Sequence, residues 1–463
     1  MIPKTLKYGS KVESAVARSS RINIAPQNGT STYGLGDTII INLPTRNNLV
    51  LVPTESYLKF NCKFTSAVAN NAFRLDSCGI HGIFQRIRVF HGSNLLQDID
   101  NYGLLAKMLF DLQQPTDATY GKMSMLAGTR TDLTVTSAQA AYAQNSVYSA
   151  VQTNSGERVG GAPAALLGNA GTVNDTYCVN LISLVGSLCS ANYIPLFGMT
   201  SAPLRVEIQL VDTLYKGVSV LSSTGAADAG TLSITNCEYV ANFIELGDQA
   251  MSVIVGSLEG QPLQFVVPDF RNYQYSLSLT QNVSTQVAFP IPAKFSSLKA
   301  ILVAARDKGT GTFGGFFPFS SVTNGLTDYQ FRVGSQIMPP KPPSTNAEFF
   351  SEVLKAMGSI GDINYQPSID KTSYSITTSA ASNDTAAYVS STSSGSFFVG
   401  LDLENYCGAS KDTIFAGYNS NTDDIFWIAN FTTPNATGVV RFDAYANFDS
   451  VVVCDNNTAY VKF

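Results

Sequence analysis

The chain has 463 residues, of which 44% are hydrophobic and only 14% are charged, with a formal net charge of −5. This length allows two or three domains with large apolar cores, and the acidic balance argues against a protein that coats nucleic acid, which requires dense Lys and Arg. Seven cysteines without a CxxC pair indicate neither a disulfide framework nor a zinc site, so we expect reduced thiols in a cytosolic product.

The first segment, residues 1–36, is predicted to be a basic arm. It lacks the apolar run of a signal peptide, and no stretch of the chain has the roughly 18 apolar residues of a membrane span. Secretion is therefore not expected. We expect the arm to contact a neighbouring subunit, an internal membrane or an anionic genome, and a solvated tail is the alternative. The arm contains a single acidic residue, Glu13. Its basic residues are Lys4, Lys7, Lys11, Arg18 and Arg21.

Alternation of apolar and polar residues predicts strands in both halves of the chain. The clearest cases are 58–64 and 204–210 in the first half and 273–279 and 442–448 in the second. A period of two places successive side chains on opposite faces, so antiparallel sheets with one buried face are indicated. No such strand is predicted within residues 1–21. Turn signals such as Asn324-Gly325 separate the strands and favour an all-β sandwich class.

An internal repeat is the most informative feature. In each half a strand leads through a Gly-Ser pair into a helical segment with one apolar stripe, and the two stripes are offset by a constant 245 residues. Thr345 and Glu348 fit a capping box for the second helix, and Gly358 fits a left-handed position after its end. The stripe residues are Leu104, Leu105, Met108, Leu109 and Leu112, and then Phe349, Phe350, Val353, Leu354 and Met357.

The repeat divides the chain into two sandwiches after the arm. We predict a first sandwich over 37–246, a connector over 247–261 and a second sandwich over 262–463. After each helix a long segment poor in charge, 113–176 or 359–395, is predicted to form a surface loop. Two unrelated β domains are the alternative.

Three segments of the sequence resemble a known family: YIPLFGMTSAPLRVEIQLVDTLY (193–215), FRVGSQIMPPKPPSTNAEFFSEVLKAMG (331–358) and RFDAYANFDSVVVCDNNTAYVKF (441–463). They resemble the double jelly-roll major capsid proteins of the adenovirus, tectivirus, virophage and polinton-like lineage. The resemblance implies two tandem eight-stranded jelly rolls, each with a short helix and a long surface loop. It also implies upright rolls, three copies per pseudo-hexagonal capsomer, and towers built from the two long loops.

Candidate chemical residues are few, and we assign no catalytic, cofactor-binding or metal-binding residue. His81 and His91 flank an apolar strand and are expected to be loop or strand-end residues. The glycines of GxGxxG, Gly309, Gly311 and Gly314, precede an aromatic segment that contains a proline, so a loop is favoured over a nucleotide site. The acidic pairs Asp402/Glu404 and Asp423/Asp424 could bind Ca²⁺ but more often cap turns.

The function that we predict is structural. The chain is expected to be a viral major capsid protein that assembles as trimeric capsomers into an icosahedral shell, located in the virion and assembled inside the host cell. Its expected partners are further copies of itself, neighbouring capsomers, and minor capsid or penton proteins. The alternatives are a two-domain β-sandwich binding protein, such as a carbohydrate-binding, spike or minor capsid protein, and a glycoside-processing enzyme. We place Trp427, the single tryptophan, in the core of the second sandwich because its neighbours are apolar.

Overall fold

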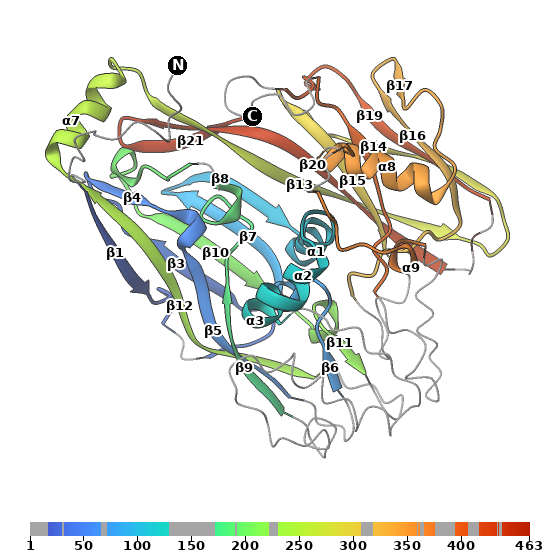
Figure 1. Ribbon diagram of the computed structural model, residues 1–463, viewed down its shortest axis with the longest axis horizontal. Coiled ribbons are helices and arrows are strands. Elements are labelled where there is room, and N and C mark those ends of the chain that lie inside the picture. The colour runs from blue at the N-terminus through green and yellow to red at the C-terminus, as the bar shows by residue number, and fades with distance from the viewer. Residues whose placement is uncertain are drawn as a thin grey trace, which may run out of the picture.

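The computed structural model describes residues 17–29, 32–65, 72–128, 172–189, 192–221, 230–306, 318–358, 360–361, 365–375, 394–405, 416–432, 434 and 438–463. Two β-sandwiches lie side by side, the first on the left of Figure 1 and the second on the right. No helix within these residues is long and apolar enough to cross a membrane.

The first sandwich has two antiparallel sheets. The order of the first sheet is β1-β12-β5-β9, with β2 and β4 also paired to β12, and the order of the second is β3-β10-β7-β8. A small separate pair joins β6 and β11. The strands are β1 (Ala17–Ile24), β2 (Thr32–Tyr33), β3 (Thr38–Leu43), β4 (Leu49–Leu51), β5 (Tyr57–Thr65), β6 (Ala72–Arg74), β7 (Phe84–His91), β8 (Asn94–Asp100), β9 (Thr172–Val179), β10 (Leu204–Leu210), β11 (Ser219–Leu221) and β12 (Thr231–Leu246).

The second sandwich repeats this arrangement. Its sheets have the orders β13-β20-β15-β18 and β14-β19-β16-β17, and β21 pairs with β20. The strands are β13 (Leu263–Leu279), β14 (Thr285–Ile291), β15 (Leu298–Arg306), β16 (Leu326–Val333), β17 (Gln336–Met338), β18 (Phe398–Asp402), β19 (Ile425–Phe431), β20 (Gly438–Asp455) and β21 (Thr458–Lys462).

The two strand orders correspond one to one, which confirms the predicted pair of eight-stranded jelly rolls. β1, β12, β5 and β9 correspond to β13, β20, β15 and β18, and β3, β10, β7 and β8 correspond to β14, β19, β16 and β17. The remaining strands are additions to this frame. The four segments predicted from alternation all lie within strands: β5, β10, β13 and β20.

The predicted helices are present as α1 (Tyr102–Gln113) and α8 (Asn346–Met357). Thr345 and Glu348 form the predicted capping box, but the expectation for Gly358 is wrong, because its φ of 177° is extended and not left-handed. The other α- and π-helical segments are α2 (Thr116–Ala118), a π-helical turn (Thr119–Met123), α3 (Ser124–Ala127), α7 (Asp248–Ser257) and α9 (Lys371–Tyr374). Short 3-10 helices lie at Pro53–Glu55, Gly79–Ile83, Ser187–Cys189, Leu196–Gly198 and Leu214–Lys216.

Several helices fall in segments that were expected to be loops or a connector. α2 and α3 follow α1 directly, and α9 lies within the second predicted loop, while residues 129–171 and 376–393 of these loops lie outside the described residues. α7 lies within 247–261 and buries none of its side chains.

Each sandwich has its own apolar core, and β20 contributes to both. Phe442, Ala444, Ala446 and Phe448 pack in the core of the second sandwich. Tyr445 on the opposite face of β20 packs with the core of the first. The alternation in this strand was expected to mark one buried face, but both faces are buried because the first sandwich covers the second face.

Candidate functional site: the junction between the two sandwiches

Helix α1 lies between the two sandwiches (Figure 1). Ten of its twelve residues are buried, against the single stripe that the sequence predicts. Helix α1 and the second sandwich come closest together at Gly103. A Cβ atom added to this residue would lie 2.4 Å from the ring of Phe319. A residue without a side chain is therefore needed at this point of the helix.

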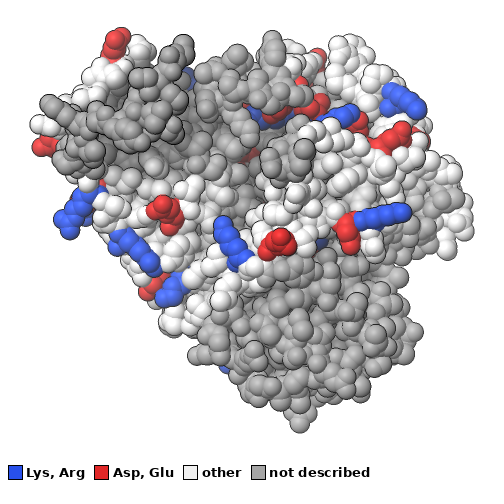
Figure 2. Space-filling model, in the orientation of Figure 1, with Lys and Arg blue, Asp and Glu red and all other residues white. Residues whose placement is uncertain are grey.

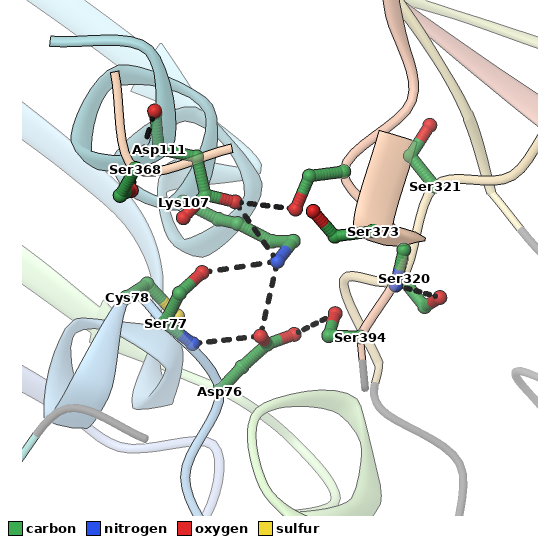
Figure 3. Close-up of polar contacts among 12 residues, drawn as sticks. Asp76, Ser77, Cys78, Lys107, Asp111, Ser320, Ser321, Ser368, Ser373 and Ser394 are labelled. Carbon is green, nitrogen blue, oxygen red and sulfur yellow. Dashed lines mark hydrogen bonds and ion pairs between the residues drawn. The ribbon is translucent and has the colours of Figure 1, made fainter. Parts of the chain in front are cut away.

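A lysine of α1 is completely buried at the junction. The Lys107 amino group lies 3.1 Å from an Asp76 oxygen and 3.1 Å from an Asp111 oxygen, and it donates to the Ser77 hydroxyl at 3.0 Å. Figure 3 shows the amino group held between the two carboxylates. A buried cation is tolerated only when it is paired and hydrogen-bonded, and here all three N–H groups have acceptors.

The second sandwich completes this cluster with serine hydroxyl groups. Ser394 donates to the Asp76 carboxylate at 2.9 Å, and Ser396 donates to the Asp111 carboxylate at 2.8 Å. The buried ion cluster, defined as Asp76, Lys107 and Asp111 with these two serines, therefore joins segments about 300 positions apart in the sequence.

A second buried polar group forms at the start of α1. Asp443 of β20 accepts from Asn101 at 2.7 Å and from the Arg306 Nε at 2.6 Å. The Tyr445 hydroxyl donates to the Asn101 carbonyl at 2.9 Å. Asn101 has a left-handed φ of 50°, a conformation that asparagine accepts more readily than most residues.

Strand β8 supplies a third contact through Gln97. Its amide donates to Asp269 of β13 at 2.9 Å, and its oxygen accepts from the Leu184 amide at 2.6 Å. Burial raises the pKa of Asp269 from 3.8 to about 7, although the hydrogen bonds that it accepts from Gln97 and from the Phe270 amide act in the opposite direction. The protonation of this carboxyl group is therefore sensitive to pH near neutrality.

Both histidines are buried. His91 ends strand β7, as expected, whereas His81 lies in the short 3-10 helix Gly79–Ile83 that precedes this strand. His91 Nδ1 accepts from the Ala459 amide at 3.1 Å, and Nε2 lies 3.0 Å from the Met199 carbonyl, which requires the neutral Nε2–H tautomer. Because Ala459 lies in β21, His91 also joins the two sandwiches. Burial lowers the pKa of His81 to about 3, and its Nδ1 contacts the Tyr102 hydroxyl at 3.0 Å.

The predicted arm residues are not part of this junction. Lys4, Lys7 and Lys11 lie outside the described residues. Arg18 and Arg21 lie in β1, which pairs antiparallel with β12 over all eight of its residues. The expectation of no strand within residues 1–21 is therefore wrong. Arg21 donates to the Tyr57 hydroxyl at 2.5 Å and lies over its ring.

The other candidate residues have structural partners where they are described. Asp402 accepts from the Glu404 amide at 2.9 Å, as in a turn cap, and Asp424 pairs with Lys294 at 2.9 Å. The GxGxxG glycines and Cys407 lie outside the described residues. Within the described part of the chain, no three His, Cys, Asp or Glu residues are grouped as metal ligands would be.

Almost none of the junction residues could be identified from the sequence. One signal was present: Lys107 interrupts an apolar helix and has Asp111 four positions later, the spacing of a helical ion pair. The residues of the second sandwich that bind to these groups show no comparable pattern in the sequence, because isolated serines and asparagines are common throughout this chain.

No known protein family matches the sequence, and no curated protein matches it. The mavirus major capsid protein aligns with 10% identity over 100% of this chain and 95% of its own, with a TM-score of 0.58. The Faustovirus major capsid protein aligns with 10% identity over 97% and 92%, with a TM-score of 0.57.

A third structure, of the PBCV-1 virus capsid, aligns with 10% identity over 99% of both chains, with a TM-score of 0.58. These solved structures have the double jelly-roll fold, and this chain shares it over nearly its whole length. The fold that the sequence resemblance implied is confirmed.

Proposed function

We propose that this chain is the major capsid protein of an icosahedral virus and that it acts in the virion by self-assembly. One observation carries the proposal: the likeness to viral capsid proteins covers nearly the whole chain and so includes both jelly rolls. The polar groups at the junction between the rolls hold them together. A rigid pair of rolls is what a tiling subunit requires.

The surface agrees with a structural role. Figure 2 shows that much of the described surface on this face carries neither basic nor acidic side chains. Interfaces between permanent partners are depleted in charge and enriched in apolar area. The expected partners are further copies of the chain, with minor capsid or penton proteins at special positions of the shell.

We also propose the domain division 1–36, 37–246, 247–261 and 262–463, with the first segment as an assembly arm. Residues 17–24 of the arm belong to the sheet of the first roll, so its basic residues Arg18 and Arg21 have fixed positions. The residues that precede Arg18 would then make any contact with an internal membrane or with the genome.

The binding-protein alternative has less support. Carbohydrate-binding surfaces usually present clustered aromatic side chains, whereas Trp427 is 2% exposed. Among the side chains that the structure describes, the exposed aromatic ones are Tyr193 and Phe463. The enzyme alternative has no assigned pair of carboxylates, and we propose that the chain performs no chemical step.

Electron microscopy of the purified protein tests the proposal. Hexagonal capsomers or closed shells are the expected result. Isolated monomers over the micromolar range, with the fold intact by circular dichroism, would contradict the proposal and favour a binding protein.

A further inference from the structure

The buried ion cluster holds an amine beside two carboxyl groups. The Lys107 Nζ atom lies 3.1 Å from Oδ1 of Asp76 and 3.1 Å from Oδ2 of Asp111. The side chains of Lys107 and Asp76 are fully buried, and that of Asp111 is 7% exposed. An amine beside one carboxyl group, with a second carboxyl group that can move a proton, has the groups that amide formation requires.

Asp76 is the carboxyl group with hydrogen-bond donors on both oxygens. Oδ1 accepts from the Ser77 amide at 2.7 Å, and Oδ2 accepts from the Ser394 hydroxyl at 2.9 Å (Figure 3). Fixed donors of this kind stabilise the negative charge that develops on the oxygens when an amine attacks the carboxyl carbon. Asp76 is therefore the better electrophile, and Asp111 is placed to take a proton from Lys107.

The surroundings of the cluster exclude water. Cys78 beside it is fully buried, and burial, together with the negative charge of Asp76, raises the pKa of its thiol well above the usual value. Burial disfavours the charged forms of amines and carboxyl groups alike, so a neutral amine beside a protonated carboxyl group becomes accessible. Amide formation would remove two of the three buried charges of the cluster, which are costly to keep out of water.

We propose that Lys107 and Asp76 become joined by an amide bond that the folded chain forms by itself, with Asp111 transferring the proton. The ammonium group first gives one proton to Asp76. Nζ then bonds to Cγ of Asp76 and passes a second proton to Asp111. A C–O bond of Asp76 breaks, and the oxygen leaves as water with the carboxyl proton and the proton that Asp111 returns. Asp111 ends as it began, and no oxidant or further reactant is needed.

The fixed positions of the reacting groups supply the rate. Groups held in a productive orientation within one molecule react as if at concentrations of up to about 10⁵–10⁸ M. Ser394 belongs to the second sandwich, so the donor on Oδ2 is present only after the two sandwiches have packed together. The ionic state of the cluster therefore precedes the bond, and the bond follows docking of the sandwiches.

The bond would close a loop over residues 76–107, which contains β7 and β8. These strands carry His91 and Gln97, two of the residues that bind the second sandwich. A cross-link that closes a loop lowers the entropy of the unfolded chain. The amide would thus fix the part of the first sandwich that the junction uses.

Mass spectrometry of the denatured full-length chain tests the proposal. We expect a mass lower by one water molecule than the sequence gives. Trypsin should fail to cleave after Lys107, because its amine is acylated, and the digest should contain residues 75–86 joined to residues 89–122. Fragmentation of this joined peptide then places the bond at Asp76.

Three variants assign the roles. Lys107→Arg keeps the positive charge without a reactive amine and should have the full mass. Asp111→Asn keeps the size of the side chain but cannot accept the proton, so water loss after refolding should be at least about a hundredfold slower. Lys299→Arg is the control, because Lys299 lies 2.6 Å from Asp449 but is 24% exposed. This variant should still lack one water molecule.

Three results would overturn the inference. The first is a full mass for the native chain with its fold intact by circular dichroism. The second is water loss confined to residues 89–122, which would place the amide at Asp111 and not at Asp76. The third is water loss that persists in K107R, which would show that another pair reacts. None of these results bears on the proposed capsid function, because self-assembly does not depend on the bond.

Discussion

Trp427 lies in a cluster of aromatic rings inside the second roll. Its ring stacks on Phe289 at 5.7 Å between centroids and packs against Phe442 at 5.3 Å. We expect Trp427→Ala to lower the free energy of unfolding by about 3–5 kcal/mol, because it removes buried apolar area and leaves a cavity. Denaturant unfolding measures the loss. Trp427→Phe should cost much less, since the indole N–H has no hydrogen-bond partner among the described residues. A loss below about 1 kcal/mol for the alanine variant would contradict the packing.

Lys107 offers a second prediction for a single residue. Lys107→Met removes the cation between two buried carboxylates, so we expect a loss of about 3–5 kcal/mol in the free energy of unfolding. Lys216→Met is the control, because Lys216 forms a similar ion pair with Asp212 at 2.7 Å on the surface. That exposed pair should contribute less than about 1 kcal/mol. Equal losses in urea unfolding would mean that the buried ion cluster does not stabilise the junction.

Asp269 makes stability depend on pH. Its pKa is about 7 in the folded chain and near 3.8 when unfolded, so between these values the folded state binds more protons. Stability contributed by the protonated carboxyl group is therefore present below about pH 4 and is lost as the pH rises to about 7. Asp269→Asn should remove this loss, so the variant gains stability relative to the native chain from pH 4 to pH 7. Thermal unfolding at several pH values measures the difference, and a constant difference would contradict the assignment.

At the scale of elements, β1 distinguishes two parts of the predicted arm. Deleting residues 1–16 leaves every described strand in place, so we expect an unchanged midpoint of thermal unfolding. Deleting residues 1–24 removes a strand paired over eight residues with β12, which should lower the midpoint and prevent trimer formation. Scanning calorimetry and light scattering measure the two effects. If both deletions behave alike, β1 has no special part in stability or assembly.

For the whole molecule, we predict a trimer of about 150 kDa, from three chains of 49.5 kDa. Salt should not dissociate it, because apolar contacts are not screened as exposed ion pairs are. Light scattering between low salt and about 1 M salt tests this. A mass that falls steadily as salt is added would show that surface charge holds the copies together.

The sequence by itself determined the features that depend on neighbouring residues. Alternation located β5, β10, β13 and β20, the apolar stripes located α1 and α8, and the 245-residue repeat indicated two similar rolls. These patterns are local because a strand or helix shows its buried face through its own period. β1 was missed because it is an exposed edge strand, and neither of its faces is consistently apolar.

Only the tertiary structure decided how the two rolls join. Asp76, Lys107 and Ser394 come together from distant parts of the sequence, and no local period relates them. The same reason explains Asp443 and Tyr445, whose side of β20 reads as solvent-facing in the sequence but is buried against the first roll. Whether the second face of a strand meets water or protein depends on what packs against it, and that is a property of the assembled chain.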